Sequence, residues 1–295
     1  MAAGLAVVCG MGTNARATPI SHGALELVAD SQSIPPGREF KLGLHFQLEK
    51  GWHIYWVNPG DSGEPPRVEW HLPAGLNPGV IEWPTPQRFQ SSTVVDYGYE
   101  DAVLLMVPVN VDASLKPQRS AQIGATVKLL VCSHEMCIPG QAELSLTLPV
   151  RAGLPVPDNK DASLFTAAQK SLPQAPPQTW KLTAAQTSDS FVLSANFGRR
   201  SAGGEITSAM FFPLVESEIR NSAPQKLVSQ KTNFQLTLRK SDQLLNPPAW
   251  LRGVLVVSFG NSQPDRTFSI DVPVSKNLPV RNPGATKMSS AVGVR

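Results

Sequence analysis

Hydrophobic and polar side chains alternate along the chain from residue 39 onward. Apolar residues take every second position of that segment: Phe40, Leu42, Leu44, Phe46 and Leu48. Polar residues take most positions between them, so the pattern predicts a strand with one buried face. Similar signals predict strands at residues 25–28, 52–57, 68–72, 103–109, 127–131 and 142–148. Short strands separated by turns rich in Gly, Pro, Asn and Asp are typical of a β-sandwich.

A proline-rich stretch separates this region from a second one of the same kind. Residues 151–177 contain five prolines around one short helix, which is expected at about residues 161–171. Alternation then resumes at residues 191–197, 210–215, 234–238, 254–259 and 268–272. We therefore predict an all-β protein with two β-sandwich domains, residues 18–150 and 178–276, joined by a Pro-rich linker at 151–177. The tail, residues 277–295, lacks a periodic apolar face and is expected to be disordered.

Residues 1–17 are expected to be a signal peptide. Their apolar stretch ends at Ala15, Arg16 and Ala17, a small-x-small site that a signal peptidase could cut. No basic leader precedes the stretch, so a truncated peptide is one expectation and a frayed Ala/Gly-rich terminus is the alternative. We expect a periplasmic or otherwise exported protein from which Cys9 has been removed. No other stretch reaches the roughly 18 consecutive apolar residues of a spanning helix, so no transmembrane segment is expected.

The charge of the chain argues against one class of partner. Its 295 residues carry 26 Lys and Arg against 23 Asp and Glu, and the resulting net charge of +3 is dispersed. A nucleic-acid-binding protein would cluster its basic residues on one face. We therefore expect no nucleic-acid partner.

Reactive side chains gather in the first predicted sandwich. Every histidine, tyrosine and cysteine lies before Ile138. Apart from Met210, the second predicted sandwich therefore lacks the usual nucleophiles and soft metal ligands, and we expect it to be a structural or docking module.

Cys132 and Cys137 are the two cysteines expected to remain after export. An even pair in an exported protein is first interpreted as a disulfide. The pair follows the predicted strand at 127–131 and precedes the one at 142–148, with four residues between the cysteines. Such a bend can bring the two Cα atoms within the roughly 4.4 to 6.8 Å that a disulfide requires.

Three interpretations of this pair are open. Closing so short a loop stabilises a fold only modestly, which favours a bond that exchanges with other thiols over a purely structural one. A protonated His134 would favour the thiolate, whereas Glu135 would oppose it. The third interpretation is a Cu(I) site, since the same loop carries four soft or borderline ligands: Cys132, His134, Met136 and Cys137. If the bond exchanges with other thiols or is purely structural, no cofactor is expected.

Four segments resemble a known family. They are residues 51–63 (GWHIYWVNPGDSG), 81–89 (IEWPTPQRF), 96–100 (DYGYE) and 131–139 (VCSHEMCIP). They are similar to the periplasmic N-terminal region of the DsbD family of thiol:disulfide interchange proteins, particularly its ScsB-like branch, which is associated with copper tolerance. The resemblance runs from about residue 22 to 275, because residues 211–213 and 221–225 fit the second periplasmic domain of that branch.

The resemblance implies immunoglobulin-like sandwiches and a thiol-disulfide oxidoreductase of the protein-disulfide reductase type. Cys132 and Cys137 correspond to the exchanging pair, with Cys137 as the attacking thiol. The implied partners are a membrane-embedded electron donor of the DsbD type and periplasmic disulfide-bearing proteins. The alternative is a copper-binding or docking module of a membrane-associated redox system, in which the disulfide is structural.

The resemblance also implies a cap loop at residues 89–99 that covers the sulfurs, with Phe89, Tyr97 and Tyr99 as its candidates. An aromatic beside a strand more often belongs to a core. We assign Trp52, Trp56, Trp70 and Trp83 to packing, expect His53 to be half-exposed, and expect residues 58–63 to form a turn.

The sequence carries neither the multi-helix membrane domain nor the thioredoxin-like domain of that family. Three arrangements are therefore open. The chain works with a separate membrane protein that supplies the electrons, it is a fragment of a longer protein, or its cysteine pair has become structural.

Overall fold

The computed structural model describes residues 17–158, 160–197, 206–260 and 264–276. These residues form three β-sheets and one α-helix, so the predicted all-β class is confirmed. The expected signal peptide, with Cys9, and the expected disordered tail lie outside the described residues, apart from Ala17. No helix in the described part of the chain is both long and apolar enough to cross a membrane.

Residues 18–150 form two sheets. The first has the strand order β1-β2-β3-β9-β6. Its strands are β1 (Thr18–Ile20), β2 (Gly23–Ala29), β3 (Glu39–Leu48), β6 (Leu76–Pro78) and β9 (Ala102–Val111). The second has the order β11-β10-β4-β8-β7, with β5 also paired to β10. Its strands are β4 (His53–Gly60), β5 (Arg67–His71), β7 (Gln87–Ser91), β8 (Val94–Glu100), β10 (Gln118–Cys132) and β11 (Cys137–Val150).

The alternating residues of β3 are buried as predicted. Phe40, Leu42, Leu44 and Phe46 are at most 2% exposed. They share one apolar cluster with inward-facing residues of the second sheet, such as Ile123 and Val127 of β10. The two sheets therefore pack face to face around a common core, the arrangement that their alternating patterns require.

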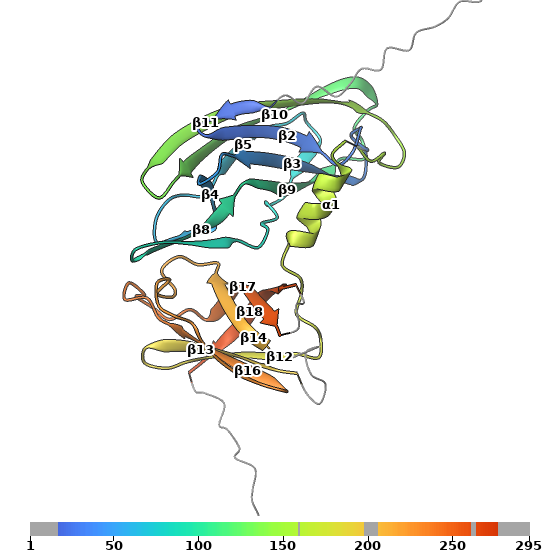
Figure 1. The fold of residues 1–295 in the computed structure, drawn as a ribbon. Helices are drawn as coiled ribbons and strands as arrows, with labels where there is room; N and C mark the ends of the chain where they lie inside the picture. The colour runs from blue at the N-terminus through green and yellow to red at the C-terminus, as the bar shows by residue number, and fades with distance from the viewer. Residues whose placement is uncertain (1–16, 159, 198–205, 261–263, 277–295) are drawn as a thin grey trace, which may run out of the picture.

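The helix α1 (Ala162–Ser171) covers the outer face of the first sheet, as Figure 1 shows, and confirms the short helix expected at 161–171. Phe165 and Ala168 of α1 pack against Val28, Leu104 and Met106, which alternate along β2 and β9 with the residues of the sandwich core. That sheet is consequently buried on both faces.

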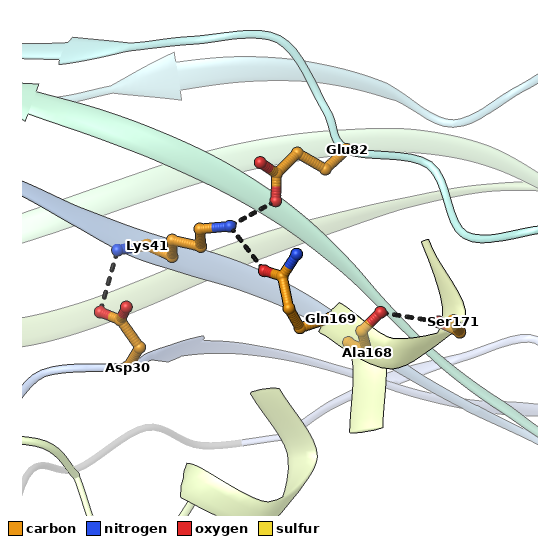
Figure 2. A network of polar contacts seen from close by, with 6 residues as sticks. All are labelled: Asp30, Lys41, Glu82, Ala168, Gln169 and Ser171. Atoms are coloured by element: carbon orange, nitrogen blue, oxygen red, sulfur yellow. Dashed lines mark hydrogen bonds and ion pairs between the residues drawn. The ribbon is translucent and has the colours of Figure 1, made fainter. Parts of the chain in front are cut away.

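A polar network also fastens α1 to the first sheet (Figure 2). The Nζ of Lys41 on β3 donates to Glu82 Oε2 at 2.7 Å and to Gln169 Oε1 of α1 at 3.0 Å. The Asp30 carboxylate accepts the backbone N–H of Lys41 at 2.9 Å. The half-buried ammonium is thus paired with a carboxylate and a helix side chain, which fixes the helix on the sheet.

Residues 181–275 build the third sheet, in the order β14-β17-β18-β12-β13-β16-β15. Its strands are β12 (Lys181–Gln186), β13 (Ser190–Asn196), β14 (Ile206–Pro213), β15 (Lys226–Gln230), β16 (Asn233–Arg239), β17 (Trp250–Phe259) and β18 (Arg266–Ser275). Among the residues that the structure describes, two residue pairs join its two halves, between β12 and β18. Buried residues of both halves nonetheless form one cluster, which includes Phe191 of β13 and Phe268 of β18. We call residues 181–275 the C-terminal β region; its status as a second domain behind a linker stays a prediction.

Candidate functional site

Cys132 and Cys137 form a disulfide at the tip of a long hairpin. Cys132 ends β10, Cys137 begins β11, and the two are direct partners in the antiparallel ladder. Their sulfurs are 2.08 Å apart and their Cα atoms 4.1 Å apart. The Cα atoms are slightly closer than in most disulfides because directly opposed residues of neighbouring strands are drawn together.

The two cysteines differ sharply in exposure. Cys132 is fully buried, whereas Cys137 is exposed. The strand order explains the difference: at Cys132, β10 lies between β11 and β4, while β11 is the outer strand of the sheet. The bond thus offers one approachable cysteine and one shielded cysteine to a molecule in solution.

The bend between the cysteines is held by Ser133. Its Oγ accepts the N–H groups of Glu135 and Met136 at 3.1 and 3.3 Å, and its own N–H donates to the Met136 carbonyl at 2.8 Å. These bonds leave His134, Glu135 and Met136 exposed. The four candidate Cu(I) ligands all lie at the tip of this hairpin, and the two cysteine sulfurs are bonded to each other. The described residues contain no cluster of three or more His, Cys, Asp and Glu side chains arranged to hold a metal ion.

His53 lies on β4, directly opposite Cys132 of β10. It is only 6% exposed, so the expectation of a half-exposed residue is wrong. Burial, with a further contribution from the nearby His134, lowers the pKa of His53 to about 4. The ring is therefore neutral near pH 7, and its Nε2 has no hydrogen-bond partner among the described residues.

Tyr55 is a site residue that the sequence interpretation missed. It lies two positions beyond His53 on the same face of β4, and its hydroxyl is 3.5 Å from Cys137 Sγ. Burial, and then the charge of Asp96, raises the pKa of Tyr55 to about 12. The hydroxyl stays protonated at neutral pH and can donate a hydrogen bond to a sulfur anion.

Phe89 is the cap candidate that the structure places beside these residues. Its ring stacks on His53 with centroids 4.7 Å apart, and the edge of the Tyr55 ring meets His53 at 5.2 Å. Phe89 itself is half-buried. An aromatic layer of Phe89, His53 and Tyr55 therefore adjoins the disulfide.

The segment at 89–99 is a β-hairpin, not the loop that was expected. It consists of β7 and β8, in which Phe89 pairs with Asp96 and Arg88 with Tyr97. Because side chains alternate between the faces of a sheet, Tyr97 and Tyr99 point away from Phe89. Both are buried in the sandwich core, where the Tyr99 hydroxyl donates to the Pro84 carbonyl at 2.8 Å. The pattern Val95, Tyr97, Tyr99 is the alternation signal that could have identified β8.

A family comparison identifies this part of the chain. Residues 25–149 match the family model described as thiol:disulfide interchange protein DsbD, N-terminal. Residues 25–149 are a DsbD N-terminal domain. The match ends one residue before the end of β11, so it contains both cysteines and the aromatic layer.

Among the solved structures compared, one shares this fold. The crystal structure of the N-terminal periplasmic domain of ScsB from Proteus mirabilis has a TM-score of 0.63 and 16% identity, and the match covers 90% of this chain and 98% of that one. A protein of unknown function from Porphyromonas gingivalis W83 has a TM-score of 0.22, 11% identity and coverages of 84% and 99%. The periplasmic chaperone SfaE has a TM-score of 0.21, 9% identity and coverages of 85% and 100%. The comparison with curated proteins finds no match.

The segment 58–63 of the DsbD N-terminal domain is more than the turn that was expected. Its first three residues continue β4, and the buried Asn58 side chain donates to the Pro213 carbonyl of the C-terminal β region at 2.8 Å. At its other end, Gly63 has a φ of +83° and lies against the Tyr55 ring, where an added Cβ would be 2.1 Å from a ring carbon. Glycine is required there because any side chain would displace Tyr55.

Proposed function

We propose that this chain is an exported thiol-disulfide exchange protein that passes reducing equivalents to disulfide-bearing partners through Cys132 and Cys137. The observation that carries the proposal is the unequal exposure of the two cysteines within one bond. Exchange needs one sulfur that a partner can reach and a second that stays close enough to resolve the mixed disulfide. The tip of the hairpin meets both requirements.

The reaction begins from the reduced pair. The Cys137 thiolate attacks one sulfur of a partner disulfide, forming a mixed disulfide and releasing the other partner sulfur as a thiolate, which takes up a proton. Cys132, having lost its proton, then attacks Cys137 Sγ, and the first partner sulfur departs and is protonated. Two electrons and two protons pass to the partner, and the Cys132–Cys137 bond is formed again.

The residues around the pair have distinct parts in this scheme. The protonated Tyr55 hydroxyl, 3.5 Å from Cys137 Sγ, donates to the thiolate and lowers the free energy of the anion. His53 supplies an uncharged neighbour for Cys132, since its pKa of about 4 keeps the ring neutral near pH 7. Phe89 covers His53 and restricts approach from that side.

Regeneration of the reduced pair requires a dithiol donor. We infer a membrane-embedded donor of the DsbD type and a periplasmic location, on the basis of the DsbD N-terminal domain and the likeness to the periplasmic domain of ScsB. We also infer a two-domain chain of immunoglobulin-like sandwiches joined by the Pro-rich segment 151–177. Most buried residues of 18–150 form one cluster and most of those of the C-terminal β region form another, which supports that division.

A trapping experiment tests the exchange reaction. Reduced Cys132→Ser protein, mixed with a disulfide-bonded client protein, is expected to accumulate a mixed disulfide at Cys137, detected on a non-reducing gel and by mass spectrometry. The matched Cys137→Ser variant should trap much less, because Cys132 is buried. Equal trapping by both variants, or none by either, would contradict the proposal.

A further inference from the structure

Asn221 of the C-terminal β region binds the hairpin that carries Phe89. Asn221 is 6% exposed, and both ends of its side-chain amide are bonded: Oδ1 accepts the Tyr97 hydroxyl at 3.0 Å, and Nδ2 donates to Asp61 Oδ1 at 2.8 Å. Its backbone carbonyl accepts a bond from the Arg88 guanidinium at 3.3 Å. One asparagine thus holds both strands of the hairpin and the neighbouring 58–63 segment.

The apolar contacts at this place reinforce the polar ones. Phe212 of β14 meets Tyr97 edge to face at 5.1 Å between centroids, and it meets Trp56 at 6.4 Å. Phe212 and Val254 belong to the core cluster of the DsbD N-terminal domain, although they come from the C-terminal β region. Figure 1 shows β8 on the side of the domain that faces this region. The contact is therefore a packed interface.

The hairpin residues that Asn221 contacts lie one cross-strand pair away from Phe89, the cap candidate. Arg88 and Tyr97 are cross-strand partners, and the next pair is Phe89 with Asp96. Since neighbouring pairs of an antiparallel ladder move together, holding Arg88 and Tyr97 also holds Phe89 against His53. His53 in turn lies opposite Cys132.

A second connection runs through Asp61. Its Oδ2 accepts the backbone N–H of Val95 at 2.8 Å, so the same carboxylate bridges Asn221 and β8. The 58–63 segment also carries Gly63, which lies against Tyr55. The hairpin that carries Phe89 and the segment whose Gly63 lies against Tyr55 are thus both bound to Asn221.

We propose that Asn221 is a positioning residue by which the C-terminal β region holds the Phe89 hairpin against His53 and so limits thiol access to the disulfide from the side of the buried Cys132. This inference rests on the proposed exchange function and adds its regulation. The C-terminal β region then does more than act as a spacer: it controls approach to the bond from the His53 side, while Cys137 is exposed.

The test uses a pair of variants of the full chain. Asn221→Asp places two carboxylates together, and the repulsion should release the hairpin. Asp61→Asn combined with Asn221→Asp exchanges the donor and the acceptor: the new amide at 61 can donate to the new carboxylate at 221, which still accepts from Tyr97. The double variant should restore the closed state.

The readout is the rate at which dithiothreitol reduces the oxidised protein, followed by free-thiol titration at fixed pH. Loss of one or two buried hydrogen bonds predicts roughly a tenfold faster reduction of Asn221→Asp, and a rate within about twofold of wild type for the double variant. Trp180→Phe, which loosens the other buried cluster, should lower the melting temperature without changing the rate.

Further variants make the outcome decisive. If Asn221→Asp does not fold, Tyr97→Phe removes only the hydroxyl bond and should accelerate reduction about fivefold. Phe89→Ala should also accelerate it, and adding Asn221→Asp to Phe89→Ala should have little further effect, since both open the same cap. A wild-type reduction rate in folded Asn221→Asp or Tyr97→Phe, or a double variant that stays fast, would overturn the proposal. Failure of the exchange function would appear separately, as absence of the Cys137 trap with unchanged dithiothreitol results.

Discussion

Cys132 and His53 lie directly opposite each other on β10 and β4, and both are buried. The imidazole is neutral at physiological pH, so the shielded sulfur has no cationic neighbour on this side. The exposed Cys137 instead has the Tyr55 hydroxyl beside it. The two sulfurs of one bond thus lie in different environments, and several measurable consequences follow from the residues that create the difference.

His53 should make the folded protein sensitive to mild acid. Its pKa is about 4 in the folded state and about 6.5 in an unfolded chain, so the stabilising contribution is present above pH 6.5 and is lost as the pH falls toward 4. The loss attributable to His53 should be up to about 3 kcal/mol. Urea unfolding at pH 7.5, 5.5 and 4.5 should show a smaller decline in stability for His53→Phe than for wild type. Parallel declines in the two proteins would contradict the assignment.

Glu218 should have the opposite pH dependence. It is 1% exposed, its carboxylate has no hydrogen-bond partner among the described residues, and burial raises its pKa to about 7. The folded state keeps this proton between pH 4.5 and 7 while the unfolded state releases it, so stability is lost as the pH rises through that window.

Replacing Glu218 with Gln should therefore stabilise the protein more at pH 8 than at pH 4, by up to about 3 kcal/mol. The measurement is denaturant unfolding at both pH values. The exposed Glu216 offers the matched control, since Glu216→Gln should change stability little at either pH. An equal effect of Glu218→Gln at pH 4 and pH 8 would rule out a buried protonated carboxyl group.

Tyr55→Phe should raise the pKa of the Cys137 thiol in the reduced protein. Removal of one hydrogen bond to an anion at a partly exposed place predicts a rise of roughly one pH unit. The pH dependence of Cys137 alkylation by iodoacetamide, mapped by mass spectrometry, measures it. Tyr99→Phe is the control, because the Tyr99 hydroxyl donates to the Pro84 carbonyl instead. An unchanged or lowered Cys137 pKa in Tyr55→Phe would show that the hydroxyl does not support the thiolate.

Reduction of the disulfide should leave the fold intact. The loop it closes runs only from Cys132 to Cys137, which predicts a loss of about 2 kcal/mol from the free energy of unfolding. The long β10–β11 ladder below the tip remains paired in either redox state. Far-ultraviolet circular dichroism should be unchanged by a dithiol, with a modest fall in the urea midpoint. Global unfolding on reduction would instead favour a structural disulfide.

Local sequence pattern determined much of this protein. Alternation predicted β3 and its buried residues, the proline-rich interval contained the expected helix, and the spacing of the two cysteines predicted a bond at the bend between two strands. These features depend on residues close together in the chain, where side-chain periodicity and turn chemistry act directly.

Tertiary structure alone decided the remainder. Alternation indicates that Phe89 and Tyr97 occupy opposite faces, but only the packing of the sheets decides which face adjoins the disulfide and which enters the core. The burial of Cys132 depends on β4 pairing beside it, which no local pattern records. Asn58 and Asn221 find their partners more than 120 residues away, at Pro213 and Tyr97. A short polar side chain is equally compatible with a turn or a buried bond until the distant segment that completes the bond is in place.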